Sequence, residues 1–176
     1  MRTAKRIIVA MLLCTIPLGA AMAQSSFSAG VGVNFFRYET PYLTALSATY
    51  LPELTDGLEL NLGAEFGITT EEVDGSQQPR ILLPFNVGLN FTFPREQMTY
   101  VFGVGLSPVF NFMPDADPDF RFYMGPYLKG AVRVRVHPIM SWFLEAQQDL
   151  LIGGPAWINT STRLATGINF SFEAQP

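Results

Sequence analysis

The sequence predicts an all-β fold, an eight-stranded antiparallel up-and-down barrel that crosses a membrane. Eight segments alternate apolar and polar residues with a period of two, so each has one apolar and one polar face. The chain opens on a pattern typical of exported proteins, and only 15% of its residues are charged, against about 25% in a typical soluble domain. At 176 residues, we expect a single barrel domain.

Residues 1–23 have the pattern of a secretory signal peptide. Three basic residues precede a short apolar run and a small-residue cleavage site: Arg2, Lys5 and Arg6, then Ile7 to Leu18, then Ala21-Met22-Ala23. The run is shorter than the roughly 20 residues that a membrane-spanning helix needs. We expect cleavage after Ala23, which removes the sole cysteine, Cys14, and excludes disulfides and thiol catalysis from the mature domain, residues 24–176.

The overall charge excludes one class of partner. The formal net charge is −4 and the sequence pI is about 4.9. A nucleic-acid-binding protein needs a basic face that displaces counterions, so we expect no nucleic acid partner. No stretch after residue 23 stays apolar for about 18 residues, so a membrane crossing requires strands closed into a barrel.

The first four strands are expected between residues 27 and 93. Their apolar faces, taking every second residue, run from Phe27 to Phe35, Leu46 to Tyr50, Leu58 to Ile68 and Ile81 to Phe93. The third segment is the most regular, because Leu58, Leu60 and Leu62 alternate with Glu59 and Asn61. This period of two predicts strands and not helices.

The last four strands are expected between residues 100 and 172. Their apolar faces run from Tyr100 to Phe110, Phe120 to Val136, Trp142 to Leu150 and Leu164 to Phe172. In the sixth segment, Val132 and Val134 alternate with Arg133 and Arg135. An even number of strands is typical of bacterial outer-membrane barrels.

The connectors alternate in length. Residues 52–57, 94–98 and 137–140 form short turns, whereas residues 70–79, 113–119 and 153–162 are longer and rich in Gly, Pro and Asp. Short turns on one side and longer loops on the other are typical of outer-membrane barrels. This arrangement predicts that both termini lie in the periplasm with the short turns.

The volume of the apolar faces decides which face points outward. A soluble lipocalin-like barrel has the same alternation with its apolar face inside. An eight-stranded barrel is only just wide enough to be filled by side chains, and these bulky faces do not fit within it. We therefore expect the apolar face to contact lipid and the Gly, Ser, Asn and charged face to line a narrow lumen.

Three prolines fall inside the expected strands. Pro84, Pro108 and Pro126 lie in the fourth, fifth and sixth segments, where a proline removes a ladder hydrogen bond. All three lie nearer the long loops. Either the outer rim is bulged there, or the loops extend further into the strands than the pattern indicates.

The chain resembles the small eight-stranded outer-membrane proteins of the OmpA-barrel, OmpX and NspA kind. The resemblance covers Phe27 to Phe172, and its most specific element is the last segment, Gly167-Ile168-Asn169-Phe170-Ser171-Phe172, which looks like the aromatic-ended signal read by the barrel-assembly machinery. It implies an outer-membrane location in a Gram-negative envelope. The implied partners are outer-membrane lipids, lipopolysaccharide and the barrel-assembly machinery.

The candidate chemical sites favour a protein without enzymatic activity. PagL-like lipid A deacylases and PagP-like acyltransferases share this architecture and need a histidine at the outer leaflet. The single histidine, His137, is expected in a short periplasmic turn. Asp115, Asp117 and Asp119 superficially resemble a calcium loop but lack its glycine and final glutamate, so we expect a solvated acidic loop. No catalytic, metal-binding or cofactor residue is assigned.

Charged residues on the polar face are the candidate functional residues. Ten point into the lumen by parity: Glu59, Glu65, Arg80, Arg121, Lys129, Arg133, Arg135, Glu145, Asp149 and Arg163. A hairpin centred on Ile139 places Glu145 opposite Arg133 and Asp149 opposite Lys129. Such pairs either close the lumen as an ion-paired core or line a gated polar path.

Three functions remain open on the sequence alone. The first is an envelope-structural or surface-interaction role, exerted through the loops and with a largely closed lumen. The second is a narrow, porin-like channel for ions or small solutes, and the third is a lipid-modifying enzyme. Bilayer conductance separates the first two, and lipid A analysis tests the third.

Overall fold

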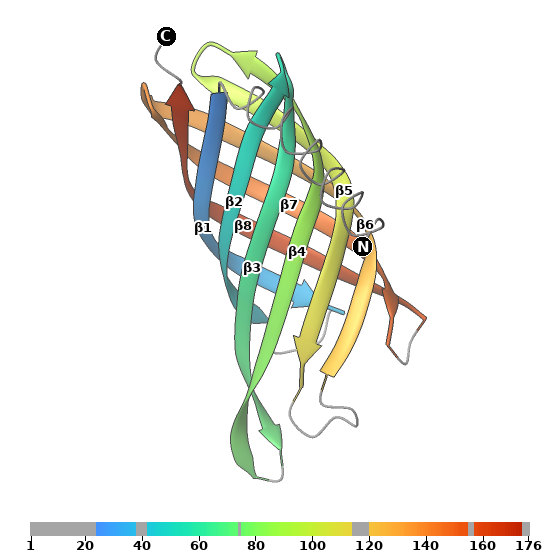
Figure 1. Cartoon of the computed structure of the whole chain (residues 1–176). Helices are drawn as coiled ribbons and strands as arrows, with labels where there is room; N and C mark the ends of the chain where they lie inside the picture. The colour runs from blue at the N-terminus through green and yellow to red at the C-terminus, as the bar shows by residue number, and fades with distance from the viewer. Residues whose placement is uncertain (1–23, 38–41, 74, 114–119, 155–156, 174–176) are drawn as a thin grey trace, which may run out of the picture.

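The chain forms one closed β-barrel in the computed structural model, which describes residues 24–37, 42–73, 75–113, 120–154 and 157–173. Each strand is antiparallel to its neighbours in chain order (Figure 1). The strands are β1 (Gln24–Phe36), β2 (Leu43–Thr55), β3 (Leu58–Val73), β4 (Ser76–Arg95), β5 (Met98–Phe112), β6 (Phe120–His137), β7 (Met140–Gly153) and β8 (Ile158–Glu173). The eight expected strands are confirmed. In the described part of the chain, no helix is long and apolar enough to cross a membrane.

The barrel has two unlike ends. Figure 1 shows the turns β2–β3, β4–β5 and β6–β7 at the same end as the start of β1 and the end of β8; we call this the short-turn end. The ends of β1, β3, β5 and β7 lie at the opposite end, which we call the long-loop end. The ring is closed by β1 and β8, which pair from Gln24 with Glu173 to Phe36 with Ser161.

The apolar faces point outward. Leu46, Leu128 and Leu144 are each more than half exposed (58%, 58% and 53%), whereas inward neighbours such as Asn61 and Asn90 are buried. The soluble lipocalin-like alternative is therefore wrong, because that fold needs the apolar face inside. The expected orientation of the two faces is confirmed.

The prolines neither bulge the rim nor end the strands. Pro84 lies within β4, and pairing of β4 with β3 lapses for two residues beside it and resumes at Leu82 with Gly67 in the same register. Pairing lapses in the same way between β4 and β5 beside Pro108, and between β6 and β7 beside Pro126. Each proline therefore costs ladder hydrogen bonds on one side only, and neither of the two expected accommodations is used.

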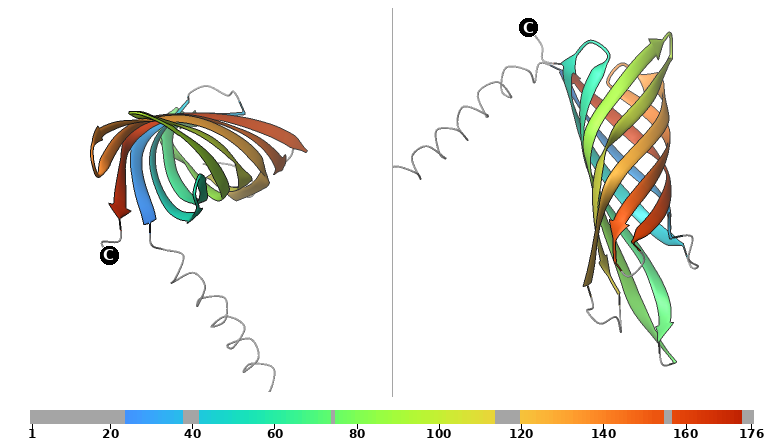
Figure 2. Two further views of the ribbon diagram at one scale, coloured as in Figure 1. Left: turned by 90° about the horizontal axis from the view of Figure 1, so that it is seen from above. Right: turned by 90° about the vertical axis from the view of Figure 1, so that its right-hand side faces the viewer.

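Residues 70–79 are mostly strand, which corrects the expectation of a long loop there. Thr70 pairs with Pro79 and Val73 with Ser76, so β3 and β4 continue as a two-stranded ribbon that extends beyond the rest of the barrel (Figures 1 and 2). Among the described residues, the pairing of β4 with β5 reaches only to Ile81, so Pro79 lies on a strand edge, where a missing N–H is tolerated. Gly75, with φ of 76°, takes up the left-handed backbone of the turn.

Candidate functional site

The lumen contains a stack of buried and part-buried charges. Seven of the ten expected inward residues form ion pairs there, and we call them the ion-pair stack: Glu59, Glu65, Lys129, Arg133, Glu145, Asp149 and Arg163. Each of the four carboxylates lies within 3.8 Å of a cation. A narrow, poorly hydrated interior requires such pairing, because an unpaired buried charge is costly.

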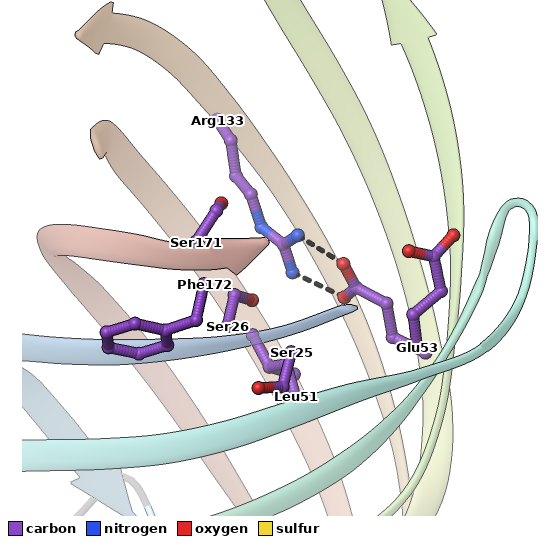
Figure 3. Close-up of a pocket in the computed structure, with 8 residues that line it drawn as sticks. Ser25, Ser26, Leu51, Glu53, Arg133, Ser171 and Phe172 are labelled. Atoms are coloured by element: carbon purple, nitrogen blue, oxygen red, sulfur yellow. Dashed lines mark hydrogen bonds and ion pairs between the residues drawn. The ribbon is translucent and has the colours of Figure 1, made fainter. Parts of the chain in front are cut away.

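Arg133 and Glu59 form the layer nearest the short-turn end. Arg133 donates to the two carboxylate oxygens of Glu59 at 2.6 and 2.7 Å, a bidentate pair across the lumen from β6 to β3 (Figure 3). Asn90 also donates to Glu59, at 3.4 Å. Both charged side chains are only 13% exposed. The geometry of a bidentate pair fixes both side chains in one orientation.

Arg163 occupies the centre of the most buried layer. It donates through Nε and Nη2 to Asp149 at 3.0 and 2.7 Å, and its Nη1 lies 3.8 Å from Glu65. Nη2 also lies within hydrogen-bonding distance of Asn86 and Ser107. This one guanidinium therefore joins side chains from β3, β4, β5 and β7, and its two carboxylate partners are nearly inaccessible to solvent.

Polar side chains complete the coordination of the two carboxylates. Gln147 donates to Asp149 at 2.9 Å, and Asn34 donates to Glu65 at 2.9 Å. Ser161 in turn donates to Asn34 at 2.7 Å. A buried charge is tolerated when its remaining lone pairs are satisfied in this way.

The pairing of Lys129 and Glu145 corrects the expected partners. Lys129 lies 3.1 Å from Glu145, whereas the sequence predicted Glu145 with Arg133 and Asp149 with Lys129. The turn places His137 opposite Met140, and an irregularity between Arg135 and His137 shifts the β6–β7 register. As a result Glu145 lies opposite Ala131, and Lys129 reaches it diagonally.

Three arginines have other surroundings. Arg80 is buried, donates to Asn111 at 3.4 Å and lies over the ring of Phe36 with 5.7 Å to the centroid. Arg121 is half-buried opposite Asn111 at the long-loop end, and Arg135 is exposed at the short-turn end. Among the described residues, Arg121 and Arg135 have no ion-pair partner, so they are not part of the stack.

An apolar cluster fills the lumen at the long-loop end, and the sequence reasoning missed it. We call it the apolar plug: Phe36, Leu43, Leu82, Val109, Tyr123 and Leu151, all at most 2% exposed. The Phe36 and Tyr123 rings meet edge to face, 5.2 Å apart. Leu82 and Leu151 lie in runs of three apolar residues, Ile81 to Leu83 and Leu150 to Ile152. Such unbroken runs signal two apolar faces.

Free volume is distributed unevenly along the lumen. At the short-turn end a polar hollow of about 690 Å³ reaches inward to Arg133 and Asn169. Beside Glu145, the two enclosed cavities measure about 10 and 20 Å³, room for about one water molecule each. In the layer around Glu145, these two cavities leave room for single water molecules and not for a solute.

The remaining candidates are His137 and the acidic residues of the predicted loops. His137 lines the polar hollow at the short-turn end, next to Pro138 in the β6–β7 turn. The described residues contain no group of three or more His, Cys, Asp or Glu side chains that could hold a metal ion. The acidic loop residues Asp115, Asp117 and Asp119 lie outside the described residues. The expected signal peptide and its cleavage site at Ala23 lie outside them too.

Comparison with known proteins shows the fold. No protein-family model and no curated protein sequence matches the chain. Among solved structures, it is similar to Neisserial surface protein A (NspA), with a TM-score of 0.66, 11% identity, and coverage of 85% of this chain and 96% of that one. It is also similar to Pseudomonas aeruginosa OprG, with a TM-score of 0.62, 11% identity, and coverage of 88% of this chain and 98% of that one. For Yersinia pestis Ail, the attachment invasion locus protein, the TM-score is 0.58 and the identity 11%, with coverage of 85% of this chain and 98% of that one. The chain has the fold of these small eight-stranded transmembrane barrels, as its last strand and alternation had indicated.

Proposed function

We propose that this protein is an integral outer-membrane barrel without enzymatic activity, which serves envelope structure or surface interaction. In this proposal residues 1–23 are removed on export, and the short-turn end faces the periplasm. The outward apolar residues contact outer-membrane lipids and lipopolysaccharide, and the barrel-assembly machinery inserts the chain.

The filled lumen is the observation that carries this proposal. The ion-pair stack and the apolar plug follow one another along the barrel, and the spaces beside Glu145 hold about one water molecule each. An eight-stranded barrel whose interior is filled by its own side chains leaves little room for a solute to pass, which favours a role exerted through its surface.

The ribbon formed by β3 and β4 supports surface interaction as the more specific role. It extends past the rim (Figure 2), and among the described residues the pairing of β2 with β3 ends at Ile68, before the outer part of β3. Glu71 and Glu72 give this segment negative charge. A protruding strand offers main-chain groups to a partner that adds a strand, and its charge favours a basic one.

A narrow channel for ions or small solutes is the second candidate. The hollow of about 690 Å³ favours it, because this hollow already opens a path from the short-turn end to Arg133. Planar-bilayer recording of the purified protein separates the two roles. We expect rare, small conductance events, and steady large conductance would make the channel the better description.

Membrane location and orientation are tested on intact cells. Single cysteines at Gly75 and Gly154, on the long-loop side, should react with a bulky maleimide, and cysteines at Asp56 and Gln97 should stay protected. Folded protein should show a heat-modifiable band in detergent. The reverse labelling pattern would contradict the orientation, and recovery from the soluble periplasm would contradict the membrane location.

The absence of lipid-modifying activity is tested by mass analysis of lipid A from cells that express the protein. Unchanged lipid A would support this part of the proposal.

A further inference from the structure

One side chain on the outer surface does not suit a lipid environment. Most outward positions of the eight strands are apolar in the described residues, and between the two rims the polar exceptions are Gln148 and four threonines, Thr44, Thr160, Thr162 and Thr166, whereas Ser25 and Arg95 lie at the short-turn end. Gln148 lies on β7 between the outward-facing Trp142 and Ile152, and it is exposed. A polar side chain that faces hydrocarbon is costly unless its hydrogen-bonding groups find partners.

The hydrogen bonds within the barrel use only part of the Gln148 carboxamide. Its Oε1 accepts from Thr162 at 2.6 Å, and its Nε2 donates to the backbone oxygen of Asp149 at 3.3 Å. A carboxamide has two N–H donors and an oxygen with two lone pairs. Among the described residues, one donor and one lone pair of Gln148 therefore have no partner.

A notch lies beside this carboxamide on the same face. It measures about 320 Å³ and is lined mainly by Phe102, Leu128, Gly130, Ala146, Gln148 and Thr162. A Cβ atom added at Gly130 would meet no atom within 4 Å, so the surface is open at this point. Small residues next to a polar one are typical of positions where membrane proteins pack against each other.

We propose that two copies of this chain associate in the membrane through this notch, with the two Gln148 side chains paired. This rests on the membrane position proposed above. A two-fold axis along the membrane normal keeps both copies of Gln148 at equal depth, so each can meet the other. A carboxamide is complementary to itself, because one donor and one acceptor on each side form two reciprocal hydrogen bonds. A hydrocarbon chain in the notch would satisfy neither group.

Cross-linking in lipid vesicles tests the contact. The mature chain has no cysteine, so Ala146→Cys places a single thiol beside Gln148 and leaves that residue in place. Leu62→Cys, on β3 four strands away, is the matched control on the far side of the ring. In phosphatidylcholine vesicles, a short bis-maleimide should join Ala146→Cys copies much more than Leu62→Cys copies. Equal cross-linking of the two variants would overturn the proposal.

Two substitutions then separate the hydrogen bond from the notch. Gln148→Leu in the Ala146→Cys background should weaken dimerisation by about 3- to 30-fold, the range expected for interhelical polar contacts in membranes. Gly130→Leu fills the notch and should also reduce dimers, whereas Val87→Leu, a larger side chain on β4, should not. Heat-modifiable mobility verifies that each variant is folded. Dimerisation unchanged by Gln148→Leu or Gly130→Leu would overturn the proposal in favour of a bound lipid chain.

Discussion

The two ends of the lumen are held together by different interactions, apolar packing at one and an ion pair at the other. At the long-loop end six apolar side chains pack together, whereas nearer the short-turn end Arg133 and Glu59 hold each other across a polar hollow. Packing is insensitive to salt and depends on shape, while ion pairs depend on the presence of both partners. One narrow barrel can therefore combine a permanent seal with a polar interior. Four experiments test this contrast, and they follow from the largest expected effect to the smallest.

Arg163→Met should have the largest effect. It leaves Asp149 and Glu65 without their cation in the most buried layer, and breaking such a pair costs about 3–5 kcal/mol. The measurement is the urea unfolding midpoint in lipid vesicles. Arg135→Met is the control, because Arg135 is exposed at the short-turn end, and its effect should stay within about 0.5 kcal/mol. If both variants lost the same free energy of unfolding, Arg163 would contribute no more stability than an exposed arginine, which would contradict its role in the stack.

Leu82→Ala should rank next. Leu82 is fully buried in the apolar plug, and truncating a buried leucine costs about 2–5 kcal/mol. The neighbouring Leu83→Ala removes the same atoms from the outer face, where lipid can fill the space, so its cost should be smaller. The same unfolding assay compares the two. A larger loss of unfolding free energy in Leu83→Ala than in Leu82→Ala would contradict the packing of Leu82 in the apolar plug.

A double-mutant cycle at Arg133 and Glu59 should give a smaller free-energy effect, which reports on this one pair. We expect a coupling free energy of about 1–2 kcal/mol, because the pair is bidentate but lies at the edge of a hydrated hollow. Arg133 with Glu145 is the matched control. That pair should be nearly additive, and strong coupling there would restore the register that the sequence had predicted.

Tyr123→Phe should have the smallest effect. The Tyr123 hydroxyl is buried and has no hydrogen-bond partner among the described residues, so its removal relieves a desolvated polar group. Stability should change by no more than about 0.5 kcal/mol, in the same assay. A loss above about 1 kcal/mol would show that the hydroxyl has a partner, such as an ordered water.

The sequence predicted the strands better than their partners. A period of two is a local property, so Leu58 to Ile68 could be assigned to a strand without knowledge of its neighbours. Registers depend on the turns, and the irregularity between Arg135 and His137 moved Glu145 from Arg133 to Lys129. Contacts across the lumen, such as Arg133 with Glu59, lie beyond pairwise hairpin reasoning altogether.

The apolar plug and the ribbon were missed for related reasons. The alternation places Leu82 on the inward face, but we expected that face to carry Gly, Ser, Asn and charged residues, so its apolar members were not recognised as a cluster. The Gly, Pro and Asp content of residues 70–79 predicted a loop, yet among the described residues Pro79 lies on a strand edge, where a proline is tolerated. Both errors come from treating a strand as uniform along its length.

Closure between β1 and β8 has a consequence for how the chain is assembled. The residues that seal the ring, such as Gln24 and Glu173, are separated by almost the whole domain, so the final ladder forms only after the last strand has been delivered. Until then both margins of the curved sheet carry unsatisfied main-chain groups, which attract other strands. A chain shortened before β8 would keep these margins permanently, and should aggregate rather than insert.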